Sequence, residues 1–215
     1  MLDMEQTIQS KEFRLLTKGL RTIFTILMVL MIFALTMIGV LLVAVFIVTE
    51  KEVHNILVHG QIAASIHFGG LKIELANQVA NDFHFSKWNV LKLLFTATIY
   101  IALLLFIVVQ VRNVLSNLSK GIIFSGTNSR KMEWIAYAIV FLSLTVGAFR
   151  TYVTYTIFEQ FKLAELLVET GLIKGVAYQF TGVNWTLLLC GLVIWTIARV
   201  FRYGAFLQDE YDATA

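Results

Sequence analysis

The residues that could do chemistry are few, and the histidines gather in one stretch. All four histidines of the 215-residue chain lie between positions 54 and 84, near several carboxylates. Imidazole and carboxylate groups together suit a metal site or a pH sensor. The spacing gives this little support, because the first two histidines are five residues apart and a helix face repeats after three or four. We therefore favour histidines that are solvated or lie on a hairpin face, with no metal and no cofactor bound. They are His54, His59, His67 and His84.

The sequence gives little support for a catalytic site. Catalysis needs a nucleophile or an acid–base pair held in one pocket. The long apolar runs of this chain contain no Asp, Glu, His or Lys, and Arg150 lies near the end of one run. Cys190 is the single cysteine, so an intrachain disulfide is excluded. Because it lies in an apolar run, we interpret it as a small buried hydrophobe. We expect a protein that is not an enzyme.

The elements that position these residues are apolar and long. The composition is 58% hydrophobic and 14% charged, with a mean hydropathy of +0.78. Residues 22–49 contain no ionisable group, and a helix of that length, about 42 Å, exceeds a bilayer core of about 30 Å. We predict an all-α membrane protein, a four-transmembrane-helix bundle with a small extracellular β cap, as a single domain of residues 1–215. The predicted spans are about 22–49, 93–111, 134–158 and 183–201.

The distribution of basic residues predicts the orientation. Lys11, Arg14, Lys18 and Arg21 all lie within eleven residues of the first span, and positive flanks stay on the cytoplasmic side. We therefore predict a cell-membrane protein with a cytoplasmic N-terminus, loop (about 112–133) and C-terminal tail. The outer segments are then about 50–92 and 159–182. Since no dense Lys/Arg block occurs, we expect no nucleic-acid partner.

The first outer segment contains a hairpin pattern. Residues 65–75 alternate polar and apolar on both sides of Gly69-Gly70, and two glycines suit a two-residue hairpin turn. The alternating run 176–180 could add a third strand to the predicted cap. Between them, 161–173 has the spacing of an amphipathic helix. In the predicted register Ser65 faces Glu74, Ile66 faces Ile73, His67 faces Lys72 and Phe68 faces Leu71.

Two cytoplasmic stretches have recognisable local features. Gly121 can end the second span in a left-handed cap, and Ser125 can cap the next helix. Asn128 then takes the third helical position, from which its side chain can reach back to the cap. Phe124 is an apolar plug between the two helices. Gly204, beyond the fourth span, would let another backbone come close.

We expect the two stretches to meet in a cytoplasmic collar of opposite charges. An alternative is that both charged ends are solvated independently and that Phe124 and Phe201 hold the two stretches together. Exposed ion pairs contribute only about 0–1 kcal/mol each, so a collar would act through register more than through stability. The predicted collar places Lys120, Arg130 and Lys131 opposite Asp209, Glu210 and Asp212.

At these two places the chain resembles a family of bacterial four-helix membrane proteins, domain of unknown function 2975. The resemblance implies the four-span layout over most of the chain. Its members are often encoded beside small helix-turn-helix regulators, which would imply a regulatory or stress-linked role. Ile123 stands where the family often has proline, and residues 213–215 replace a more apolar ending. The residues that carry the resemblance are Gly121, Phe124, Asn128, Phe201, Gly204, Leu207, Gln208, Glu210 and Asp212.

These features favour a binding protein over an enzyme or a transporter. We expect a multi-pass protein in a lipid bilayer that binds an extracellular peptide, a lipid or a membrane-protein partner, in a regulatory, stress or immunity-type role. The alternative is a subunit of an oligomeric channel or transporter for a small solute, which would act as a homo-oligomer. Ion-coupled transport usually places ionisable groups near the membrane midplane, and the predicted spans offer none there.

Overall fold

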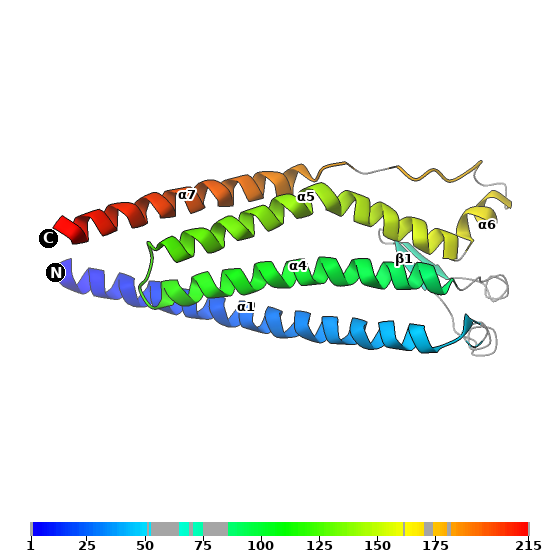
Figure 1. The fold of residues 1–215 in the computed structure, drawn as a ribbon, viewed down its shortest axis with the longest axis horizontal. Coiled ribbons are helices and arrows are strands. Elements are labelled where there is room, and N and C mark those ends of the chain that lie inside the picture. Colours follow the sequence, from blue (N-terminus) through cyan, green and yellow to red (C-terminus); the bar gives the residue numbers. More distant parts are fainter. Residues whose placement is uncertain are drawn as a thin grey trace. The chain divides into compact units, whose positions relative to one another are not determined.

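The computed structural model describes residues 2–50, 52, 65–68, 71–74, 86–160, 162–169, 174–179 and 182–214. Most of these residues belong to long helices (Figure 1). The long helices are α1 (Leu2–Ile47), α4 (Lys87–Ser119), α5 (Gly126–Gln160) and α7 (Trp185–Thr214). The short elements are β1 (Ser65–Phe68), β2 (Leu71–Glu74) and α6 (Leu163–Glu169).

The four long helices are each long and apolar enough to cross a membrane. The predicted all-α class with four such helices is therefore confirmed, as is the coarse description of a multi-pass membrane protein. The predicted apolar runs lie on these helices except at two ends. Helix α1 ends at Ile47, and α7 begins at Trp185. Asn184 fixes the start of α7, since its Oδ1 accepts a hydrogen bond from the Leu187 amide at 3.1 Å.

The contacts divide the chain into two compact units, and the single domain of residues 1–215 stays a prediction. Unit 1 contains residues 1–36, 99–147 and 182–215, and unit 2 contains 37–98 and 148–181. Three of the long helices contribute a segment to each unit, so the division falls within helices and not at a linker. A helix of 35 residues such as α5 is about 52 Å long, and its two ends therefore have different neighbours.

The first strand pair forms in the register that the alternation predicts. β1 and β2 are antiparallel, with the Cα partners Ser65–Glu74, Ile66–Ile73, His67–Lys72 and Phe68–Leu71. His67 is thus placed in β1, whereas His54, His59 and His84 lie outside the described residues.

The extracellular β cap as a whole is not supported. Residues 176–179 form no strand, and residue 180 lies outside the described part. The segment packs on α5 instead, because the Tyr178 ring makes edge contacts with Tyr155 and Phe158, with centroids 5.1 and 6.1 Å apart. The predicted amphipathic helix over 161–173 appears as the shorter α6.

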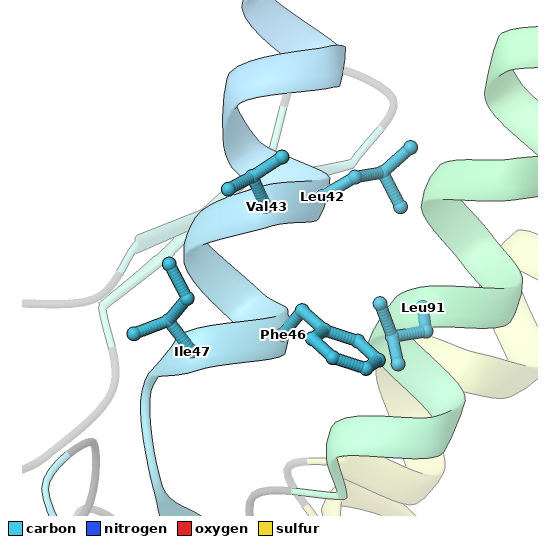
Figure 2. A pocket seen from close by; sticks show the side chains of 5 residues that line it. All are labelled: Leu42, Val43, Phe46, Ile47 and Leu91. Carbon is cyan, nitrogen blue, oxygen red and sulfur yellow. The ribbon is translucent and has the colours of Figure 1, made fainter.

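Within unit 2, the end of α1 is tied to the start of α4. The Lys87 ammonium donates to the carbonyls of Phe46 and Val48, which are among the free acceptors at the end of α1. In return, the Glu50 carboxylate accepts a hydrogen bond from the Lys87 amide at 3.3 Å. An open apolar hollow of about 320 Å³ lies beside this tie (Figure 2). It is lined by Leu42, Val43, Phe46, Ile47 and Leu91.

Within unit 1, a seam of small side chains joins α5 to α7. On α5, Ser129, Ala136 and Ser143 recur every seven residues, and all three are fully buried. On α7, Gly191 and Ala198 are buried at the same interval. Going from Ala136 back to Ser129 on α5, the facing residue on α7 moves forward from Gly191 to Ala198, also by seven residues. This is the register of an antiparallel coiled coil with a seven-residue repeat.

The contacts across this small-residue seam are close. The Ser129 hydroxyl donates to the Ala198 carbonyl at 2.8 Å. A Cβ added to Gly191 would lie 2.7 Å from Val140 Cγ2 and 3.3 Å from the Ala136 carbonyl oxygen. Small residues let membrane helices approach closely enough for packing and interhelical hydrogen bonds. Nothing in the sequence alone singled out Ser129, Ala136, Gly191 or Ala198 as an interface.

Candidate functional site

The corner between α4 and α5 begins with a glycine cap. Gly121 has a φ of +83°, the left-handed conformation that glycine adopts without a steric penalty. Its amide donates to the Leu118 carbonyl at 3.0 Å, and the Ile122 amide donates to the Asn117 carbonyl at 3.1 Å. These two bonds form a Schellman motif, so the predicted left-handed cap is confirmed.

The other side of the corner starts α5. The Ser125 hydroxyl accepts the Asn128 amide at 3.2 Å, which confirms the predicted N-cap. The Asn128 side chain is fully buried. It does not reach back to the cap: its Nδ2 donates to the carbonyls of Ile122 and Ile123 at 2.9 and 3.2 Å. Its Oδ1 accepts a hydrogen bond from Asn117 Nδ2 at 2.6 Å. One side-chain amide therefore pairs with two loop carbonyls and also joins α4 to α5.

The corner meets α7 through an aromatic side chain. The Phe124 and Phe201 rings lie 5.4 Å apart between centroids, tilted by 48°. A Cβ added to Gly204 would lie 2.7 Å from Phe124 Cδ1. The expectation that Gly204 admits another backbone is therefore wrong, because the missing side chain makes room for the Phe124 ring.

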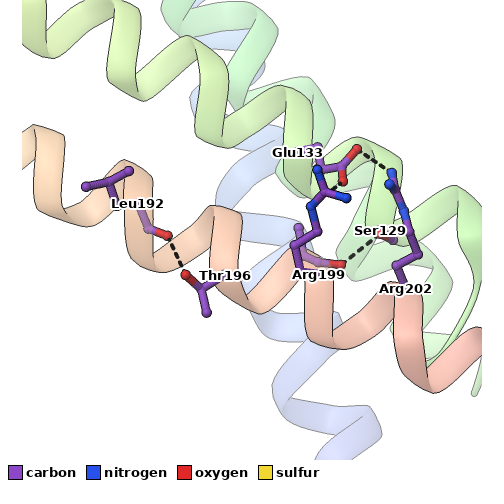
Figure 3. A network of polar contacts seen from close by, with 7 residues as sticks. Ser129, Glu133, Leu192, Thr196, Arg199 and Arg202 are labelled. Carbon is purple, nitrogen blue, oxygen red and sulfur yellow. Dashed lines mark hydrogen bonds and ion pairs between the residues drawn. The ribbon is translucent and has the colours of Figure 1, made fainter.

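About two helical turns into α5, a buried carboxylate faces two arginines of α7 (Figure 3). Glu133 is 8% exposed. Arg202 Nη2 donates to Glu133 Oε2 at 2.5 Å, and Arg199 Nε lies 3.6 Å from Glu133 Oε1. The Arg199 guanidinium also lies 5.0 Å from the centre of the Trp195 ring. We call Glu133, Arg199 and Arg202 the arginine cluster.

The arginine cluster has more positive than negative charge. Two guanidinium groups face one carboxylate, and both arginine side chains are about half exposed, at 50% and 48%. Such a group attracts anions, and planar guanidinium forks suit carboxylate and phosphate oxygens.

The part of the chain that contains these features matches a known protein family. A model of the family described as Protein of unknown function (DUF2975) matches residues 72–215. The chain belongs to this family. The match covers about two thirds of the chain and includes the corner, the small-residue seam and the arginine cluster. No curated protein and no solved structure matches the chain.

The DUF2975 motif residues fall into two groups in the structure. Gly121, Phe124, Asn128, Phe201 and Gly204 come together at the corner and its contact with α7. The remaining residues lie further along α7 and make no described contact with the corner. Of these, Leu207, Gln208 and Glu210 are exposed, and the side chain of Asp212 lies outside the described part.

The predicted charged collar stays a prediction, because the side chain of Asp212 lies outside the described part of the chain. Among the described ion pairs, none joins Lys120, Arg130 or Lys131 to Asp209 or Glu210. Of these five side chains, all except Lys131 are exposed. An exposed ion pair contributes too little free energy to keep two long side chains in one conformation. The alternative agrees with the structure: the two ends are held by aromatic packing between the corner and α7.

Sequence reasoning missed Glu133, which forms the described ion pairs between α5 and α7. Its signal was present: an acid directly before one apolar run, and Arg199 and Arg202 directly after another. No cluster of three or more potential metal ligands occurs among the described residues.

Proposed function

We propose that this chain is a bacterial cell-membrane protein that acts without catalysis, by binding a peptide, lipid or membrane-protein partner. Both termini would be cytoplasmic and the role regulatory. The arginine cluster carries this proposal, because it presents a surplus positive charge that is half exposed and yet held in place.

The state of Glu133 supports binding over catalysis. A general base must be free to take a proton from a substrate. Glu133 is buried and engaged by the guanidinium groups of Arg199 and Arg202. It is therefore suited to position the arginines.

The basic residues before the first apolar run support the orientation. Arg14, Lys18 and Arg21 precede that run, and Arg199 and Arg202 follow the last one. Cationic flanks are retained on the cytoplasmic side. Protease treatment of sealed vesicles carrying a tag at either terminus tests this directly. Digestion of one tag and protection of the other would contradict the proposed orientation.

Copurification tests the binding function. The tagged full chain is isolated from native membranes in mild detergent, and its retained proteins, peptides and lipids are identified by mass spectrometry. We expect at least one species to stay with the wild type and to be lost from Arg199→Gln/Arg202→Gln.

The matched control for this experiment is Lys92→Gln/Arg150→Gln. It removes the same charge from exposed positions of unit 2 and should retain the species. Identical sets from all three proteins would argue against a binding role for the cluster.

A further inference from the structure

We propose that the arginine cluster binds the phosphate group of an anionic phospholipid. This inference rests on the proposed function, since it names a ligand for the same site.

The position of the cluster along the chain matches the headgroup region. Glu133 directly precedes the uncharged run 134–149, and Arg199 directly follows the uncharged run 175–198. The hydrocarbon core thus ends at this level on two neighbouring helices. Trp134, the first residue of its run, is 51% exposed, and tryptophan is enriched at membrane–water interfaces.

The guanidinium groups have donors to spare. Each arginine carries five N–H donors. Within the described part of the chain, the bond from Arg202 to Glu133 is the one hydrogen bond that these two guanidinium groups make. Since both side chains are about half exposed, the other donors can reach the oxygens of a phosphate at the membrane surface.

The charge balance selects the headgroup. The cluster carries one surplus positive charge, and the phosphodiester of phosphatidylglycerol carries one negative charge that no amine neutralises. A zwitterionic headgroup such as phosphatidylcholine supplies the same phosphate with its own cation. Meanwhile Glu133 and the Trp195 ring hold Arg202 and Arg199 in place, which lowers the entropy cost of binding.

The decisive test is lipid binding to the purified full chain, measured by native mass spectrometry in detergent with added phosphatidylglycerol or phosphatidylcholine. We expect the wild type to prefer phosphatidylglycerol. A basic side chain near an anionic surface contributes about a fivefold gain in affinity, so Arg199→Gln/Arg202→Gln should bind phosphatidylglycerol about thirtyfold more weakly. Lys92→Gln/Arg150→Gln should bind it as the wild type does.

A second variant separates fork geometry from charge and also covers the case in which the glutamine variant fails to fold. Arg199→Lys/Arg202→Lys keeps both charges but loses the planar forks. We expect phosphatidylglycerol binding about fivefold weaker than in the wild type, with an unchanged melting temperature.

Inorganic phosphate in large molar excess distinguishes the two sources of the group. It should not displace the lipid, because the acyl chains contribute to binding. Full displacement would assign the site to free phosphate and overturn the lipid proposal.

Two further results would overturn it. One is equal affinity for the two lipids in the wild type. The other is equal phosphatidylglycerol affinity in the wild type and in every folded arginine variant. If lipid binding shows no dependence on the arginines while a copurified partner still depends on Arg199 and Arg202, only the lipid proposal is overturned. If the partner is lost as well, the proposed function falls with it.

Discussion

Helices α1 and α7 each contain two glycines, but these glycines have opposite surroundings. A Cβ added to Gly191 or Gly204 of α7 would lie 2.7 Å from a side chain of unit 1. Among the described residues, a Cβ added to Gly19 or Gly39 of α1 would meet nothing within 4 Å. A glycine in an apolar helix therefore marks an interface only where a second element fills the space.

The same contrast appears in burial. The apolar window of α1 buries none of its residues, whereas that of α7 buries 11% and that of its partner α5 buries 39%. Lipid tails solvate leucine as well as another helix does, so apolar character alone does not bring membrane helices together. Close packing and interhelical hydrogen bonds do so, and the small-residue seam provides both.

The largest expected effect comes from overfilling this seam. Gly191→Leu forces a side chain into the space occupied by Val140, and we expect it to lower the free energy of unfolding by about 3 kcal/mol. Gly39→Leu on α1 is the matched control and should change it by less than about 0.5 kcal/mol. Both are measured by unfolding in detergent, followed by circular dichroism. Equal effects of the two substitutions would remove the distinction between α1 and α7.

The next effect concerns the corner, where the packing is polar. Asn128→Asp keeps the size but removes the two N–H donors to Ile122 and Ile123, leaving both carbonyls without that partner. We expect a loss of about 2 kcal/mol in unfolding free energy. Thr127→Ala, at the exposed neighbouring position, should cost less than about 0.5 kcal/mol. A stable Asn128→Asp protein would mean that water replaces the amide.

A smaller effect distinguishes the arginine cluster from the collar. A double-mutant cycle of Glu133→Gln and Arg202→Gln should give a coupling of about 1 kcal/mol, because the pair is close but the arginine is half exposed. The same cycle on Lys131 and Glu210 should give about zero. A larger coupling for Lys131 and Glu210 would support the collar.

The smallest effect is a pH dependence just beyond the end of α1. The amide and hydroxyl of Thr49 donate to Glu52 Oε2 at 2.9 and 2.8 Å. The backbone hydrogen bond first, and then the hydroxyl one, lower the pKa of Glu52 from its ordinary value of 4.5. The local stabilisation is therefore complete above pH 4.5 and is lost as the pH falls through the lower folded-state pKa.

Thr49→Val should raise this pKa part of the way, since the backbone donor remains. Carboxyl carbon chemical shifts during an acid titration measure the change. An unchanged midpoint would show that the hydroxyl contributes nothing.

Some features were predictable because they depend on neighbours in the chain. The caps of Gly121 and Ser125 are formed by backbone and side-chain groups within a few residues. The register of β1 and β2 follows from alternation around two adjacent glycines. Local geometry and hydrogen bonding are enough to specify such elements.

Other features could not be predicted because they depend on which helix faces which. The position of Tyr178 against α5 replaced the expected third strand. Glu133 looked like one more charge at the end of an apolar run until α7 placed Arg199 and Arg202 beside it. Exposed charges offered several equally plausible pairings, and their small energies could not choose among them.

By itself, then, the amino-acid order determined the four apolar helices and the turns that end them, since hydrocarbon length and backbone hydrogen bonding depend on local composition. Tertiary structure alone decided that α5 packs on α7 through Ser129, Ala136 and Gly191, and that a buried glutamate holds two arginines. The physical reason is that helix pairing in a membrane depends on shape and hydrogen bonds between distant residues, which hydrophobicity does not encode.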